Sequence, residues 1–213
     1  MTWCVANYSC LTEKKLYFNL TGEDSVIIDG AYIQMITQKS GLRLETVLEF
    51  VRLPKWKADG AVIYRSKRKE LAAPEATSPP AEFPDPYVGL FDWLWDECKV
   101  RKILTLEVDD MGSEPHTNRG IRASLRGPGM ERDFKIEVWK WKKFDMCVDT
   151  LVTVAPKVRE VHLFSSGNTA VLRAWSARSG LGKLADLEKL FVEIYPTVRP
   201  LFCSTEGYDR TTH

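Results

Sequence analysis

The sequence has few of the features that mark several protein classes. Its five cysteines are widely spaced among 213 residues and form no C-x-x-C pair, which argues against a disulfide scaffold and a zinc ribbon. No hydrophobic run approaches the roughly 18 residues of a membrane span. The first ten residues lack a basic segment followed by an apolar one, so no signal peptide is expected. We therefore expect an intracellular, cytoplasmic protein with reduced thiols and no membrane partner.

An excess of charge of one sign is also missing. The chain holds 30 Lys and Arg against 29 Asp and Glu, a net charge of +1. Such a balance gives no general attraction for nucleic acid, and no nucleic-acid partner is expected. Trp139 and Trp141 do stand among Lys140, Lys142 and Lys143, a pattern that can stack bases and bind phosphate. We favour the alternative, in which the rings pack in the core or at a sheet edge and the lysines stay in water.

Catalytic motifs are scarce. Gly182-Lys183 is followed by Leu184, so the phosphate-binding loop motif fails, and no G-x-S-x-G segment is present. His162 shares one strand or its exit with Ser165 and Ser166, too far along the chain for the roughly 3 Å that proton transfer needs. The sequence therefore predicts no catalytic triad, no metal and no cofactor.

One polar cluster could form an alternative site. It consists of Asp109, Asp110, Glu114 and His116 at the predicted carboxyl end of a strand, where α/β proteins bind ligands. The cluster suits a hard metal ion or acid–base work. The favoured interpretation is structural: the two aspartates end a strand, and Glu114 begins a helix, where an acidic group complements the helix dipole.

A proline-rich segment divides the chain. Residues 72–86 hold five of the eleven prolines and predict a linker between a small N-terminal α+β unit, residues 1–71, and a larger domain, residues 87–213. Within the first unit, residues 16–28 predict strand, and Tyr32, Ile33 and Ile36 predict a helix. A second helix is predicted from the i, i+3, i+4, i+7 spacing of its apolar residues and ends at Pro54; these residues are Leu44, Val47, Leu48 and Val51.

Strands and helices alternate in the larger domain, which predicts parallel βαβ units. The predicted strands cover 102–108, 134–139, 158–164 and 188–195, and the predicted helices cover 87–98, 116–125, 144–155 and 168–176.

Apolar and polar residues alternate in these strands, as expected for a sheet with one buried and one wet face. Leu187-x-x-Leu190-x-Val192 and Val158-x-x-Val161-x-Leu163 also match the core of a leucine-rich repeat, whereas the first two strands have Arg101 and Asp133 at the leading position. We predict an α/β fold of irregular leucine-rich-repeat-like βαβ units with a mainly parallel sheet. The alternative is a doubly wound sheet whose polar face is covered by residues 1–71.

The wet face is the predicted interaction surface, whether it is open or covered by another segment. Its mixed charges favour selectivity and rapid encounter with a protein partner. The residues assigned to it are Glu107, Lys135, Glu137, Glu160, His162, Lys189 and Glu193.

Three segments carry a resemblance to a known family. They are V-D-D before P-H in 108–116, E-V-W-x-W-K-K-x-D in 137–145 and S-G-N-x-A-V-L-R-x-W-S in 166–176. Over roughly 24–197 the chain resembles the N-terminal, non-catalytic region of fungal intracellular subtilisin-like serine proteases. A full-length relative would be a serine endopeptidase, but this chain contains no H-G-T and no G-T-S-M-A motif, so no catalytic residue carries over.

Two functions remain open at this stage. The first is a non-catalytic protein-interaction or regulatory module that binds through the wet sheet face. The second is a small-ligand or metal-dependent enzyme that uses the Asp109–His116 loop. The first is favoured because it needs no catalytic constellation.

Overall fold

The computed structural model describes residues 16–21, 35–36, 44–55, 86–111, 115–127 and 129–195. The strands are β1 (Tyr17–Asn19), β2 (Val47–Leu53), β3 (Lys102–Asp109), β4 (Val138–Lys142), β5 (Glu160–Ser165) and β6 (Lys189–Ile194). The helices are α2 (Pro86–Asp96), α3 (Asn118–Arg126), α4 (Val148–Val154) and α5 (Thr169–Ser176), with a short 3₁₀ helix, η2 (Leu181–Lys183).

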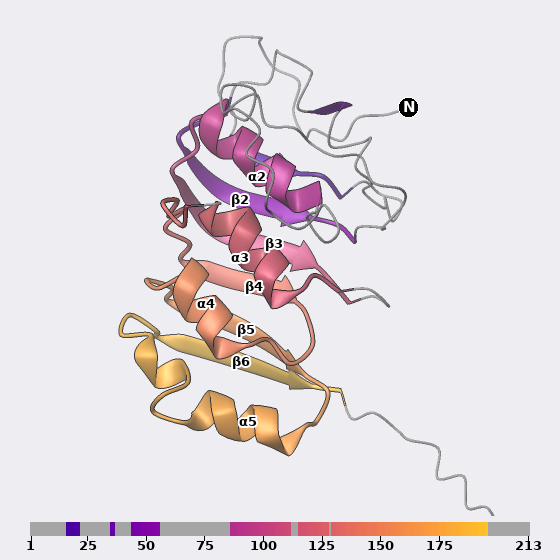
Figure 1. The fold of residues 1–213 in the computed structure, drawn as a ribbon, viewed down its shortest axis with the longest axis vertical. Coiled ribbons are helices and arrows are strands. Elements are labelled where there is room, and N and C mark those ends of the chain that lie inside the picture. The colour runs from indigo at the N-terminus through magenta and orange to yellow at the C-terminus, as the bar shows by residue number, and fades with distance from the viewer. Residues whose placement is uncertain are drawn as a thin grey trace, which may run out of the picture.

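All six strands form one parallel sheet, and their order in the sheet is their order in the chain. Parallel connections are almost always right-handed, so a sheet that grows in one direction carries its helices on one face. Figure 1 shows α2, α3 and α4 stacked along one side of the strands. The predicted α/β class with a parallel sheet is therefore confirmed. Within the described strands the order never reverses, whereas a doubly wound sheet has such a switch point.

The side chains buried on the helix side follow one spacing in four strands. At positions i, i+3 and i+5 of each strand segment the side chain is at most 2% exposed. The four sets are Leu48, Val51 and Leu53; Ile103, Leu106 and Val108; Ile136, Trp139 and Trp141; and Val158, Val161 and Leu163. These residues belong to one core together with apolar residues of α2, α3 and α4.

The strand predicted over 134–139 forms further along the chain. The strand that forms is Val138–Lys142, because the two largest apolar side chains of this segment, Trp139 and Trp141, alternate with lysines and fill the core. The predicted core packing of the two tryptophans is thereby confirmed. Ile136 is also buried, but it precedes the strand, and it, not Asp133, occupies the leading position of this unit.

The predicted helix over Leu44 to Val51 is wrong. Residues 47–53 form β2, which pairs with β3 from Val47 opposite Lys102 to Leu53 opposite Val108. Short apolar runs satisfy helical and strand spacings alike, and pairing along β3 supplies the partners for the backbone amides. The strand predicted at the start of 16–28 is confirmed as β1, whereas residues 22–28 lie outside the described residues. Of the helix predicted around Tyr32, Ile33 and Ile36, only residues 35–36 are described; they are helical, and Ile36 is buried in the core.

Residues on both sides of the proline-rich segment share one sheet and one core. Phe18 of β1 and Leu48 of β2 belong to the same buried cluster as Ile103 and Leu106 of β3. The segment itself lies outside the described residues except for Pro86, where α2 begins.

The four helices predicted in the larger domain form, with shifts at their ends. Asn168 caps α5 by accepting a hydrogen bond from the backbone N–H of Ala170 at 3.0 Å. The helix α4 begins at Val148, later than the predicted start at residue 144, and Asp145 does not cap it. Asp145 instead lies in the left-handed region, with φ of 53°, and its carboxylate accepts a 3.0 Å hydrogen bond from the backbone N–H of Ser166 at the end of β5.

Alanine substitutions in β2 test this strand against the predicted helix. Leu48→Ala removes a fully buried side chain and should lower the free energy of unfolding by about 2–5 kcal/mol. Val47 is 40% exposed, so Val47→Ala should lower it by about 0.5 kcal/mol or less. Urea unfolding followed by tryptophan fluorescence measures both. Similar losses for the two variants would contradict the strand, because both residues face the core in the predicted helix.

Candidate functional site

Charged side chains cross the sheet on the face that points away from the helices. They occupy strand positions that alternate with the buried residues, and the strand register places Arg52 beside Glu107 and Glu107 beside Lys140. We call this surface the polar face. Its acidic, basic and histidine members are Arg52, Glu107, Asp109, Lys140, Lys142, Glu160, His162, Lys189 and Glu193.

Cations and anions alternate along the polar face. The carboxylate of Glu107 lies 3.3 Å from the guanidinium of Arg52 and 3.2 Å from the ammonium of Lys142, so it joins β2, β3 and β4. The acidic position of β3 is thus neutralised by basic side chains on both neighbouring strands.

Glu160 has the same role one strand further on. Its carboxylate lies 2.8 Å from His162 Nε2, 3.6 Å from Lys189 Nζ and 4.0 Å from Lys140 Nζ. The hydrogen bond from His162 and the positive charges around it lower the pKa of Glu160, so this carboxylate stays ionised at neutral pH. Exposed ion pairs contribute only about 0–1 kcal/mol each, so stability does not explain why so many charges are arranged here.

Five of the predicted interaction residues lie on the polar face: Glu107, Glu160, His162, Lys189 and Glu193. The other two, Lys135 and Glu137, precede β4 and lie near the N-terminal ends of the strands, because β4 starts later in the chain than predicted. Three polar-face residues belong to neither of the predicted sites: Arg52, which falls in the wrongly predicted helix, and Lys140 and Lys142. The alternation of these two lysines with the buried Trp139 and Trp141 was the signal that would have found them.

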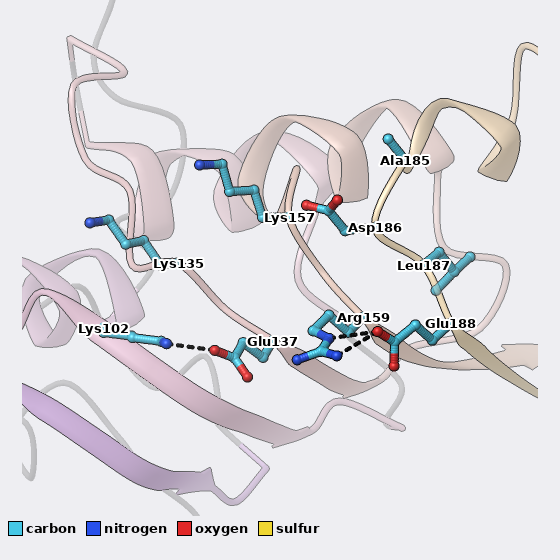
Figure 2. A pocket seen from close by; sticks show the side chains of 9 residues that line it. All are labelled: Lys102, Lys135, Glu137, Lys157, Arg159, Ala185, Asp186, Leu187 and Glu188. Carbon is cyan, nitrogen blue, oxygen red and sulfur yellow. Dashed lines mark hydrogen bonds and ion pairs between the residues drawn. The ribbon is translucent and has the colours of Figure 1, made fainter.

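Lys135 and Glu137 line a hollow of about 550 Å³ where the strands begin (Figure 2). Two ion pairs lie in it: Lys102 with Glu137 at 2.5 Å, and Arg159 with Glu188 at 2.5 Å. The residues that line the hollow include no Ser, Thr, Cys or His, so they offer no nucleophile with a histidine base. The hollow therefore has the character of a charged surface depression.

The alternative site at the end of β3 is largely buried. Asp110 accepts hydrogen bonds from the backbone N–H of His116 at 3.0 Å and from its Nδ1 at 2.9 Å, and its second oxygen accepts one from Trp141 Nε1 at 2.8 Å. The imidazole stacks on the Tyr87 ring, with centroids 4.5 Å apart, and meets the edge of Trp141. This network ties the residues that follow β3 to α2 and β4.

The other members of the predicted cluster do not complete a ligand set. Asp109 is half-buried and accepts a long hydrogen bond, 3.4 Å, from the N–H of Met111, while Glu114 lies outside the described residues. Within the described ranges, no group of three or more His, Cys, Asp or Glu side chains is arranged to hold a metal ion. Asp110 and His116 thus meet as predicted neighbours, but as part of the core.

Removal of the Asp110 carboxylate tests its structural role. Asp110→Ala leaves three buried donors, one on Trp141 and two on His116, without this acceptor. Each buried donor that loses its partner costs about 1–3 kcal/mol, so the free energy of unfolding should fall by at least about 3 kcal/mol. Asp109→Ala is the matched control and should change it by less than about 1 kcal/mol. Equal losses in urea titrations would show that the network is not the stabilising element.

Cys98 is one of two described cysteines, and its thiol is partly buried. Burial raises the pKa of its thiol to about 12, and the negative charge of Glu97 adds to the effect, so the thiol is not activated. Iodoacetamide at pH 8 should therefore leave Cys98 unmodified in the folded protein and alkylate it in urea, as peptide mass spectrometry would measure. Complete alkylation of the folded protein within minutes would contradict the protected thiol.

No protein-family model, curated protein or solved structure matches this chain. Among the residues that the structure describes, every helix is too short or too polar to cross a bilayer.

Proposed function

We propose that the protein is a non-catalytic interaction module that binds a protein partner through the polar face. One observation carries this proposal: a row of alternating charges extends from β2 to β6 and remains accessible. The exposed fractions of the paired side chains range from 16% at Glu107 to 64% at Lys189. Charges that contribute little to folding and stay in contact with water are suited to recognition.

The geometry of the sheet favours an extended partner surface over a small ligand. Neighbouring strands lie about 4.8 Å apart, so the charges form a regular array on a rigid backbone. Glu107 and Glu160 are each held by cations from neighbouring strands, which fixes their positions before binding. Because the charges nearly balance, the array discriminates between partners by pattern instead of attracting every polyanion.

The leucine-rich-repeat-like interpretation belongs to this proposal. Helices on one side, strands in chain order and the i, i+3, i+5 burial pattern support it. Repeat proteins of this kind bind through an extended open sheet surface. The resemblance to the front region of fungal subtilisin-like proteases is compatible with such a role, because that region is itself non-catalytic.

The enzymatic alternative at the Asp109–His116 loop has less support. Asp110 and His116 are buried in the core, where the three hydrogen bonds to Asp110 and the stacking on Tyr87 account for their positions. A separate test concerns serine hydrolase activity anywhere in the chain. A fluorophosphonate probe, which labels serine hydrolases, should leave this protein unlabelled.

Charge reversal on the polar face tests the proposal. Lys140→Glu/Lys142→Glu reverses the middle of the row and removes two exposed ion pairs. The wild-type protein, immobilised and incubated with a native extract of its source, should capture a specific protein that quantitative mass spectrometry identifies. The double variant should retain at least about tenfold less of it, because like charges now oppose the partner across the interface.

The control is a matched reversal on the helix side, Arg119→Glu/Arg122→Glu in α3. This variant should capture the same protein at the wild-type level. The polar-face variant should unfold within about 2 kcal/mol of the wild type, since each of the two lost ion pairs contributes about 0–1 kcal/mol, and the helix-side variant should change less. The proposal fails if the polar-face variant captures the protein normally or if only the helix-side variant loses it.

A further inference from the structure

The last strand of the sheet exposes apolar side chains that its neighbours bury. In the described part of the chain, β6 pairs with β5 and has no strand on its other side. Leu190, Val192 and Ile194 are 46%, 41% and 53% exposed, whereas their neighbours Val161 and Leu163 in β5 are almost fully buried. Exposed edge strands with apolar residues are templates for pairing with another strand.

The same three residues also present free backbone groups. The N–H of Lys189 bonds to the carbonyl of Arg159, and the N–H of Tyr195 bonds to that of Ser165. In a parallel pair alternate residues bond to the same neighbour, so residues 189, 191, 193 and 195 face β5. Leu190, Val192 and Ile194 therefore direct their N–H and C=O groups to the open edge.

We propose that a second copy of this chain pairs with β6 across a twofold axis at Phe191. Strands related by such an axis run antiparallel. The segment Lys189-Leu190-Phe191-Val192-Glu193 then matches its own reverse, because Lys189 lies opposite the partner's Glu193 and Leu190 lies opposite the partner's Val192. The complementary charges at the two ends of this segment therefore favour a second copy of the chain as the partner of β6.

The backbone geometry agrees with this register. Leu190 and Val192 face the open edge, so Leu190 and the partner's Val192 form a hydrogen-bonded pair. Phe191 with its symmetry mate, and Lys189 with the partner's Glu193, form the non-hydrogen-bonded pairs, in which the Cα atoms are only about 4.5 Å apart and the side chains are closest. A shift by two residues in either direction sets Lys189 opposite an aromatic side chain and removes both charge pairs.

The side chains on the helix side of β6 are also complementary between the two copies. Leu190 and Val192 lie on the helix side of β6, so pairing brings two exposed apolar residues of each copy together. Lys189 is 64% exposed, and its long side chain can form ion pairs both with Glu160 of its own chain and with the partner's Glu193. The two sheets become one, and both copies present their polar faces on the same side because the axis is perpendicular to the sheet.

A charge swap tests the register in the full chain. Sedimentation velocity over a concentration series should show a dimer of the wild-type protein. Lys189→Glu alone and Glu193→Lys alone each oppose like charges and should raise the dimer dissociation constant at least about tenfold. The double variant restores opposite charges and should return it to within about threefold of the wild type. A double variant as weak as the single ones would overturn the pairing, as would a wild-type monomer at about 100 µM.

A proline substitution tests the edge without disturbing β5. Val192→Pro removes an N–H that points to the open edge, whereas the bonds to β5 come from the odd-numbered residues. This variant should keep the wild-type circular dichroism spectrum and sediment as a monomer. A folded Val192→Pro protein that still forms the dimer would overturn the proposal.

A cysteine cross-link tests the axis. In the proposed register the Cα atoms of the two Phe191 residues fall within the disulfide range of about 4.4–6.8 Å. Phe191→Cys should oxidise to a 191–191 linked dimer, identified by peptide mass spectrometry. Tyr17→Cys in β1, exposed at the opposite edge, is the control and should form no disulfide-linked dimer, although it still pairs through β6. Equal cross-linking at both edges, or none at 191, would overturn the proposal.

Discussion

The fold depends on one constraint: the sheet buries only one of its two faces. Because the parallel strands follow each other in chain order, the described crossover helices α2, α3 and α4 pack on the same side, and the charged side chains on the other side remain in contact with water. Each strand must then place apolar side chains in one direction and polar ones in the other. The core around Trp139 and Trp141 and the charge row on the polar face are two results of this single arrangement.

The positions of the charges on the polar face follow from the packing of the buried side chains on the other face of the same strands. Trp139 and Trp141 fix the orientation of β4, and Lys140 and Lys142 must therefore point to the opposite face. There Lys142 meets Glu107, whose own direction is set by Leu106 and Val108. The recognition surface thus has a geometry dictated by the packing beneath it, and a shift of one residue in any strand would scatter the array.

The α/β class, the parallel sheet and most helices could be predicted from the sequence, because alternation and helix capping are local signals. The conformation of β2 could not, since the spacing of Val47, Leu48 and Val51 fits a helix as well as a strand, and only pairing with β3 decides between them. The buried network was predictable in part. Asp110 and His116 are close in sequence, but the stacking of His116 on Tyr87 depends on the packing of α2 against the end of β3.

The strand order has a last consequence, for how stability is distributed along the molecule. Each strand bonds only to its neighbours in the chain, so the sheet resembles a linear array in which cooperativity passes from one unit to the next. The interior strands have support on both sides, whereas β1 and β6 have it on one. Amide protons in β3 and β4 should consequently exchange with solvent through the rarest openings of the molecule, and those of β6 through frequent fraying from the end. The terminal strand is thus the element whose local order any binding event can most readily alter.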